Sequence, residues 1–188
     1  MEILVIILVI LVVWSIIVYN KIIGNYNAIE RAWSNVIVYE RQKQKVIPEL
    51  EKVLKEQKEF ESETLTNITK LRASISKLEA SNISPSVLKE IEQTTTELFK
   101  GINITMEAYP ELKTVEVMKG LMKEISEQQA NISASIRILN QNIEIFNNSI
   151  EIFPNHIINS ILNKKNKIEV FQDTEVEKEF SYSPFSKK

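Results

Sequence analysis

The chain has 188 residues, a formal net charge of −2 and no cysteine. The absence of cysteine excludes disulfides, thiolate metal sites, cysteine nucleophiles and a lipid-modified N-terminal cysteine. The near-neutral charge gives no electrostatic basis for a nucleic-acid partner. With three glycines and five prolines, the chain also lacks the many turns of β-sandwiches, barrels and doubly wound folds.

The first element is an uncharged apolar run from Ile3 to Tyr19, ILVIILVILVVWSIIVY. Because a helix satisfies its own backbone hydrogen bonds in lipid, this run predicts a transmembrane helix whose partner is the lipid bilayer. At ~1.5 Å per residue the run measures about 25 Å, slightly less than a ~30 Å hydrocarbon core. Asn20 and Lys21 are close enough to snorkel. We therefore expect residues 1–23 to form a transmembrane anchor.

A cleaved signal peptide is the alternative interpretation of this run. It is disfavoured because Met1 and Glu2 supply no basic n-region, the run exceeds a typical h-region and no small-x-small site follows. Basic residues near the run lie on its C-terminal side, beginning with Lys21 and Arg31. The positive-inside rule therefore favours a single-pass protein with an external N-terminus and a cytoplasmic body.

The following residues, 24–163, carry apolar stripes with steps of four and three, which are typical of packed helices. The clearest stripe comprises Ile132, Ile136, Leu139, Ile143, Phe146, Ile150 and Phe153. A flanking row of Ile138, Ile145 and Ile152 predicts a buried face wider than a two-stranded seam. Trp33 lies on an earlier stripe with Tyr26, Ile29 and Val36, and we expect it in the core.

Prolines indicate the helix ends. Ser84 and Pro85 are typical of a helix start, and Tyr109 before Pro110 of a helix end. Thr114 can cap the next helix, which the proline after Phe153 ends. Pro48 has no turn residues around it, so we expect it to bend one long helix that covers residues 25–78.

These elements predict an all-α fold. An N-terminal transmembrane helix is followed by an antiparallel up-and-down bundle of three long helices, the first bent at Pro48, and a short C-terminal helix. The long helices are expected at residues 25–78, 85–108 and 114–152. Residues 164–188 are polar and aperiodic, and we expect them to form a flexible tail.

Four blocks of sequence resemble the LemA family. They are YNAIERAWSNVIVYERQKQKVIPELEKVL at 26–54, LTNITKLRAS at 65–74, YPELK at 109–113 and FNNSIEIFPNHIINSIL at 146–162. Beyond Leu162 the family often has a Gly/Phe-rich apolar segment, where this chain has Asn163, Lys164 and Lys165. The resemblance implies a bacterial membrane protein with an antiparallel helical bundle and no established enzymatic activity.

No motif in the chain indicates catalysis. His156 is the single histidine and has no orienting partner in the sequence around it, so we expect a partly exposed structural residue. Three scattered glycines cannot form a phosphate-binding loop, and one histidine cannot supply the two Glu-x-x-His motifs of a di-iron bundle. We expect no catalytic, cofactor-binding or metal-binding residues, no cofactor and no enzymatic activity.

Arg41, Lys43 and Lys45 allow two interpretations. One is a basic patch for anionic lipid or an acidic partner, and the other is a solvated helix face. Polar residues also occur on the apolar stripes, and we expect them to be ordinary core polar groups: Thr95, Thr105 and Gln129.

The sequence therefore favours a membrane-anchored helical scaffold that binds another protein or itself. A membrane-remodelling or oligomerising coiled-coil device is the alternative, and a cofactor-binding bundle enzyme is a third possibility. Nothing in the sequence identifies the partner.

Overall fold

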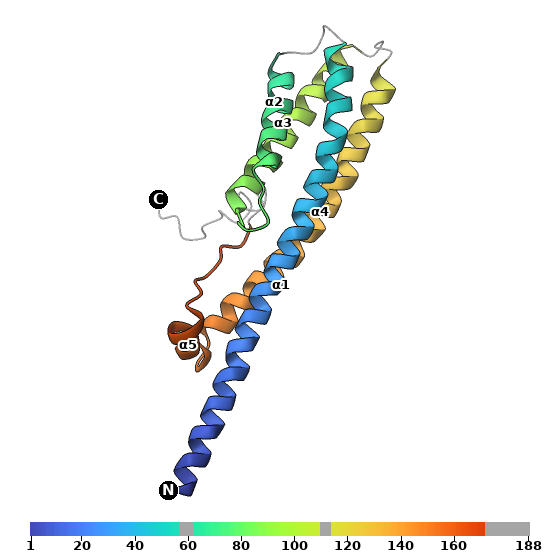
Figure 1. Ribbon diagram of the computed structural model, residues 1–188. Helices are drawn as coiled ribbons and strands as arrows, with labels where there is room; N and C mark the ends of the chain where they lie inside the picture. Colours follow the sequence, from blue (N-terminus) through green and yellow to red (C-terminus); the bar gives the residue numbers. More distant parts are fainter. Residues whose placement is uncertain (57–61, 110–113, 172–188) are drawn as a thin grey trace, which may run out of the picture.

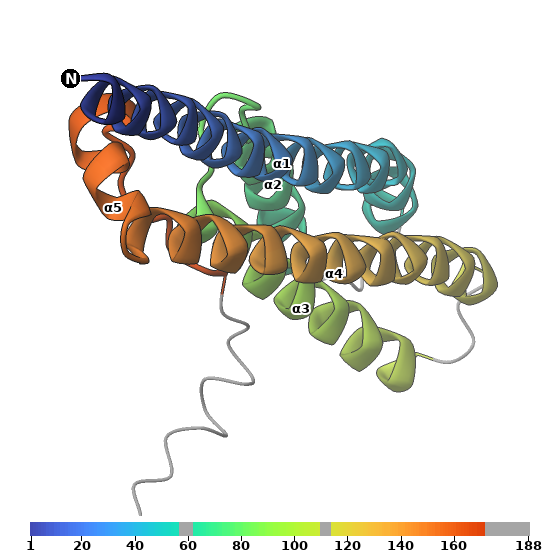
Figure 2. The ribbon, with the colours of Figure 1, turned by 90° about the horizontal axis from the view of Figure 1, so that it is seen from below.

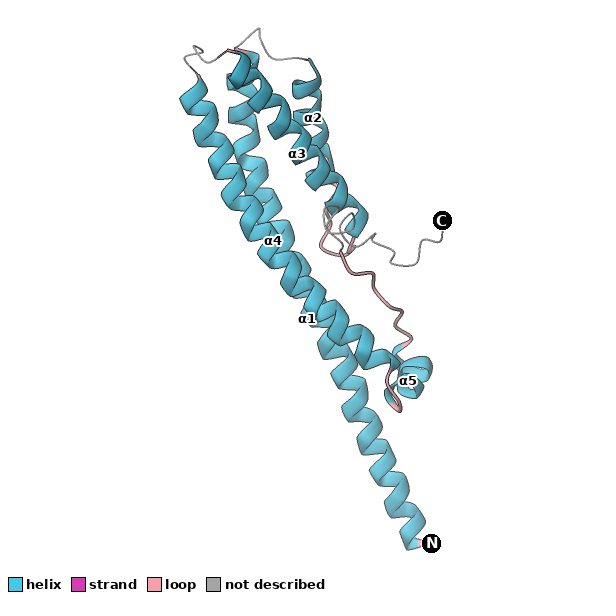
Figure 3. Cartoon of the chain, turned by 180° about the vertical axis from the view of Figure 1, so that it is seen from behind, coloured by secondary structure: helices cyan, strands magenta, loops and turns pink. Residues whose placement is uncertain are grey.

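The structure is a computed structural model that describes residues 1–56, 62–109 and 114–171 (Figure 1). Its helices are α1 (Glu2–Lys55), α2 (Ser62–Ser76), α3 (Pro85–Ala108), α4 (Val115–Glu151), α5 (Asn155–Ile158) and the π-helical turn η1 (Asn159–Asn163). The most extensive packing joins α1 to α4, followed by α2 to α3 and α1 to α2. The described residues contain no strand beyond one isolated bridge, which confirms the all-α prediction (Figure 3).

Helix α1 extends beyond the bundle at its N-terminal end (Figure 1). Every aliphatic residue from Ile3 to Val13 is at least half exposed, and burial against the rest of the chain begins at Val18. In the described part of the chain, α1 is the one helix that is long and apolar enough to cross a membrane. The same continuous helix then supplies core residues of the bundle as far as Leu54.

The prediction of one long helix over residues 25–78 is wrong for the second half of this range. Helix α1 continues through Pro48 but ends at Lys55, and α2 lies beside it in the opposite direction. Gln44 Nε2 donates to Ser76 Oγ over 3.0 Å, and Arg72 Nη1 lies 3.0 Å from Glu51 Oε2. Folding back buries the apolar stripe of α2, which a continuing helix would leave in water. The bundle therefore has four long helices instead of three.

Two close contacts hold α2 and α3 in place. Gly101 of α3 faces Thr64 of α2 so closely that an added Cβ would lie 2.8 Å from Thr64 Oγ1. Trp33 of α1 is fully buried, as predicted, and its Nε1 donates to the carbonyl oxygen of Glu79 over 2.8 Å. This bond ties the connection between α2 and α3 to α1.

The predicted stripe of α4 is buried at five of its seven positions: Ile132, Leu139, Ile143, Phe146 and Ile150. The prediction that a flanking row widens the buried face is wrong. Ile138, Ile145 and Ile152 are 54%, 48% and 53% exposed, and Phe153 is 77% exposed. Helix α4 packs mainly against α1, so no helix among the described residues covers its outer isoleucines.

The predicted helix ends are close to the observed ones. Helix α3 begins at Pro85, and α4 begins one residue after Thr114. Ser84 and Thr114 occupy the N-cap positions, but neither side chain forms a capping hydrogen bond.

Residues 164–171 run back along α4 as an extended strap, instead of forming part of the predicted flexible tail (Figure 3). Asn147 donates to the carbonyl oxygen of Ile168 over 2.9 Å and accepts from its N–H over 3.1 Å. Asn140 makes the same pair of bonds with Phe171, at 2.7 and 2.9 Å. Phe171 is buried in the core, and residues 172–188 lie outside the described part of the chain.

The spacing of the two asparagines matches the spacing of their targets. Asn140 and Asn147 stand seven residues apart on a helix, which is about 10.5 Å at 1.5 Å per residue. Phe171 and Ile168 are three residues apart, which is about 10 Å of extended chain. The tail prediction was wrong here because side-chain amides on α4 bind the backbone of this segment, and Ile168, Val170 and Phe171 pack against the core without a periodic pattern.

We expect the double variant Asn140→Ala and Asn147→Ala to release the strap. It removes four hydrogen bonds to the strap backbone, each contributing about 0.5–1.5 kcal/mol net. Hydrogen exchange measured by mass spectrometry should become faster across residues 164–171, while helix α4 keeps its protection. Asn148→Ala, an exposed change on the same helix, is the control, and equal exchange in both proteins would contradict the role of the pair.

Candidate functional site: a buried ion pair beside a polar groove

An ion pair lies inside the bundle, on the buried face of α1. Lys43 is completely buried and Glu40 is 2% exposed, and Lys43 Nζ lies 2.9 Å from Glu40 Oε2. The two residues are three positions apart, so one helix turn places them side by side. Charged residues are almost never fully buried unless they are paired, which makes this the most unusual polar feature of the core.

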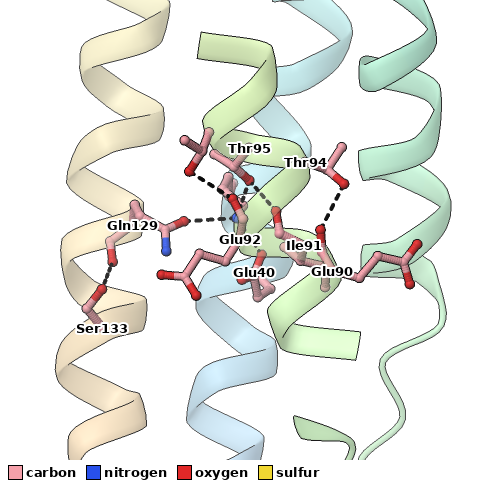
Figure 4. A network of polar contacts seen from close by, with 10 residues as sticks. Glu40, Glu90, Ile91, Glu92, Thr94, Thr95, Gln129 and Ser133 are labelled. Carbon is pink, nitrogen blue, oxygen red and sulfur yellow. Dashed lines mark hydrogen bonds and ion pairs between the residues drawn. The ribbon is translucent and has the colours of Figure 1, made fainter. Parts of the chain in front are cut away.

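Two other helices complete the surroundings of Lys43. Its Nζ donates to Gln129 Oε1 of α4 over 3.1 Å and to Thr95 Oγ1 of α3 over 3.4 Å. Figure 4 shows the Gln129 side chain reaching from α4 toward α1, and Thr95 on α3, which overlaps α1 in this view. Thr95 uses its own hydrogen to donate to the Ile91 carbonyl over 2.7 Å, so its oxygen is an acceptor toward Lys43. The ammonium group thus has two hydrogen-bond acceptors and one carboxylate oxygen at ion-pair distance.

Burial raises the pKa of Glu40 above its ordinary value of 4.5, and the charge and hydrogen bonding of Lys43 act in the opposite direction. Apart from Lys43, Glu40 Oε2 has no hydrogen-bond partner in the described residues. A buried carboxylate is poorly solvated, and a single partner offsets only part of that cost. The carboxyl group therefore depends on Lys43 more than Lys43, with its three partners, depends on the carboxyl group.

A polar groove of about 330 Å³ opens between α3 and α4 next to this pair. Its lining consists of Glu92, Thr95, Thr96, Phe99, Ser126, Gln129, Ala130 and Ser133. Thr96, Ser126 and Ser133 each donate to the backbone carbonyl four residues earlier, as Thr95 does. These hydroxyl groups therefore present oxygen lone pairs to the groove, and its surface is rich in acceptors.

The arrangement is suited to holding helices together more than to chemistry. Lys43 has no donor left for a substrate, and no histidine lies among the groove residues to act as a base. Within the described ranges, no group of three or more His, Asp or Glu side chains could hold a metal ion. The ion pair instead joins α1 to α3 and α4 at one fixed register.

Neither sequence interpretation of the three basic residues holds for Lys43. Arg41 and Lys45 are exposed, as expected of a solvated face, but Lys43 points into the core. His156 is exposed on α5, with its ring centroid 6.0 Å from that of Phe153.

The polar residues of the stripes were correctly assigned to the interior. Thr95 and Thr105 are buried and Gln129 is partly buried. Thr105 donates to the Gly101 carbonyl of its own helix over 3.1 Å. What the sequence did not reveal is that Thr95 and Gln129 converge on one lysine.

Glu40 was missed, although the sequence contains a signal for it. The stripe that begins at Ile29 and Trp33 continues in steps of four and three through both charged residues. All of its members are buried: Ile29, Trp33, Val36, Glu40, Lys43, Ile47, Leu50 and Leu54. An acid and a base three residues apart on an apolar stripe predict a buried pair, whereas a charge pattern considered alone predicts a surface.

Together these features define a class of protein: an all-α bundle with a buried ion pair that joins three helices, whose first helix extends outward as an apolar rod. The LemA family model matches residues 32–181, and the chain belongs to the LemA family. It is 29% identical over 159 residues to Protein LemA of Metamycoplasma hominis, covering 85% of this chain and 71% of that relative. No solved structure matches the chain.

We expect Lys43→Met to lower the free energy of unfolding by about 3–5 kcal/mol, because it leaves Glu40 buried without its partner. Adding Glu40→Leu should recover most of this loss, since no buried charge then remains. Urea unfolding in detergent micelles, followed by circular dichroism, measures both effects. Lys45→Met, an exposed change on the same helix, should stay within about 0.5 kcal/mol. Equal effects of Lys43→Met and Lys45→Met would contradict the buried pair.

The raised pKa of Glu40 predicts a pH dependence of stability. Above pH 4.5 the unfolded chain releases the Glu40 proton, while the folded protein retains it up to the higher folded pKa. Rising pH in this window therefore favours the unfolded state. The free energy of unfolding of the wild-type protein minus that of Glu40→Gln should fall as the pH rises from 4.5 through the folded pKa. Thermal unfolding measured across this range tests the sign, and the same trend with Glu49→Gln would refute the assignment.

Proposed function

We propose that the chain is a non-enzymatic scaffold, anchored in the bacterial cell membrane by a single span and acting through protein contacts. The observation that carries the proposal is the continuity of α1, which is bare and apolar near its start and fully buried from Ile29 onward along one stripe. An apolar helix of this length, exposed to water, would be costly, whereas in lipid it is satisfied. Anchor and bundle then form one rigid rod.

The absence of an evident reaction centre in the described residues agrees with this proposal. The most unusual polar group, Lys43, has all of its donors engaged within the bundle. The groove beside it presents acceptor oxygens from hydroxyl groups that are bonded to their own helices. Such a centre stabilises a shape, and a scaffold requires a stable shape.

A partner surface is available on α4. Ile138, Ile145 and Ile152 recur every seven residues, and each is about half exposed. A heptad row of this kind fits the apolar face of a second helix. The partner we favour is a second copy of this chain, because two such rows can face each other across a twofold axis. In the alternative, membrane-remodelling function, the same row would build larger assemblies.

The orientation that fits the charges places the bundle in the cytoplasm. Lys21 is exposed just after the apolar run, and the fold brings Lys164 to the same end of the span. The N-terminal side has no basic side chain. Basic residues close to a span favour the cytoplasmic side.

The chain has no cysteine, so Ile145→Cys supplies a unique probe for this proposal. We expect oxidation in native membranes to give a crosslinked homodimer, because residue 145 would lie near its own copy across the twofold axis. Glu144→Cys, one position away and also exposed, should crosslink much less. The thiol of the Glu144→Cys variant, which lies outside this contact, should also resist a membrane-impermeant maleimide in intact cells and react after permeabilisation.

Three outcomes would contradict separate parts of the proposal. Release of the protein from membranes by salt or carbonate would exclude the anchor. Persistent monomer with both cysteine variants would exclude self-association through α4. Labelling of the Glu144→Cys variant in intact cells would reverse the orientation, and large crosslinked arrays that deform vesicles would favour the remodelling alternative.

A further inference from the structure

Four large apolar side chains gather at the base of the bundle, on and beside α5 and η1. Phe153 is 77% exposed, Ile157 41%, Ile161 62% and Leu162 53%. The short helix is oriented with this face outward, since Asn155 and Ile158 form its buried side. We call these four side chains the juxtamembrane patch. Contiguous exposed apolar side chains of this size indicate an interaction surface.

The patch lies beside the end of the apolar run of α1. Leu162 lines a groove of about 490 Å³ together with Leu8, Leu11, Val12, Ser15, Ile16 and Tyr19. Asn163 Nδ2 donates to the carbonyl oxygen of Tyr19 over 3.4 Å. Figures 1 and 2 both show α5 alongside α1, and the two helices are in contact. The patch therefore continues the apolar surface of the span instead of forming a separate site.

The length of the bare helix determines the depth of the patch. Residues 3–17 precede the first buried position, Val18, and measure about 22 Å at 1.5 Å per residue. A hydrocarbon core is ~30 Å thick, so about 8 Å of its thickness remains. About the next one and a half turns of α1 would cross this remaining part. Those turns contain Val18 and Ile22, which are buried, and α5 and η1 contact this helix.

The charges around the patch fit the headgroup layer. The described segments 3–29 and 152–168 contain no acidic residue. Lys21 and Lys164 are exposed there, and Lys165 Nζ lies 3.6 Å from the centroid of the Tyr26 ring. Lysines next to an apolar face are typical of segments that lie in the interface of an anionic membrane.

We propose that the juxtamembrane patch inserts into the interfacial layer of the membrane that the N-terminal helix spans, as a second lipid contact. The inference rests on the proposed anchor. One span alone allows the rod to rotate and tilt freely, whereas a second contact to one side of α1 fixes both. The patch thus sets which face of the bundle, and which side of α4, is presented parallel to the membrane.

Single-cysteine variants of the full chain test the insertion. Ile161→Cys and Ile157→Cys are labelled with the fluorophore NBD, with Leu8→Cys in the span and Val117→Cys at the far end of α4 as references. The labelled proteins are reconstituted into vesicles of phosphatidylcholine and phosphatidylglycerol. Each is measured with and without a lipid that carries a nitroxide close to its headgroup. Circular dichroism of every variant verifies that the helices are formed.

We expect labels at residues 157 and 161 to show blue-shifted emission and to lose fluorescence with the nitroxide lipid, while the label at residue 117 does neither. A quenched label at residue 8 with water-like, unquenched labels at 157 and 161 would overturn the inference and leave the anchor standing. A label at residue 8 that is both unquenched and water-like in its emission would overturn the anchor itself. Blue-shifted but unquenched labels at 157 and 161 would mean that another protein surface covers the patch, and would also overturn the inference.

Discussion

One continuous helix, α1, joins an exposed apolar rod to a packed bundle, and the rest of the fold depends on how it does so. The first turns of α1 present aliphatic side chains on every side, which suits lipid. From Ile29 onward a single stripe turns inward, and α4 and α2 pack against it. Because no break interrupts α1 between these regions, any force on the bundle is transmitted to the exposed apolar rod.

The buried pair lies midway along that stripe and fixes the register between α1 and the helices packed against it. Apolar side chains alone would tolerate a shift of one helix along another, since one aliphatic contact replaces the next at little cost. Lys43 removes this freedom, because its acceptors Thr95 and Gln129 come from two different helices. A shift by one turn would leave a charge without partners in the core, which costs about 3–5 kcal/mol. The alignment of the helices therefore depends on polar contacts inside an otherwise apolar core.

The sequence revealed the class of fold because helical periodicity and proline positions are local signals. Helix α3 begins at Pro85 as predicted, and the stripe of α4 was found almost entirely. The reversal after Lys55 was missed, since no glycine or proline marks it and only the packing of α2 onto α1 requires it. The exposure of Ile145 was missed for a related reason: periodicity identifies an apolar face but does not say whether the chain itself covers that face.

The candidate site could be predicted only in part. Thr95 and Gln129 stood out as polar residues on apolar stripes, but their meeting at Lys43 depends on three helices that are far apart in sequence. Apolar periodicity could not predict the docking of the strap, because Asn140 and Asn147 bind the backbone groups of the strap. Side-chain amides that pair with main chain leave no pattern in the segment they hold.

That last property has a consequence for how this protein can change. An asparagine that binds both the N–H and the carbonyl of one residue is indifferent to the side chain there, as a strand in a sheet is indifferent to its neighbour's identity. Glu169, which is exposed between the two bound positions, is free to be replaced without loosening the attachment, whereas Val170 beside it packs against the core. The end of the chain can thus acquire new surface chemistry by substitution alone, while two amides on α4 keep it in place.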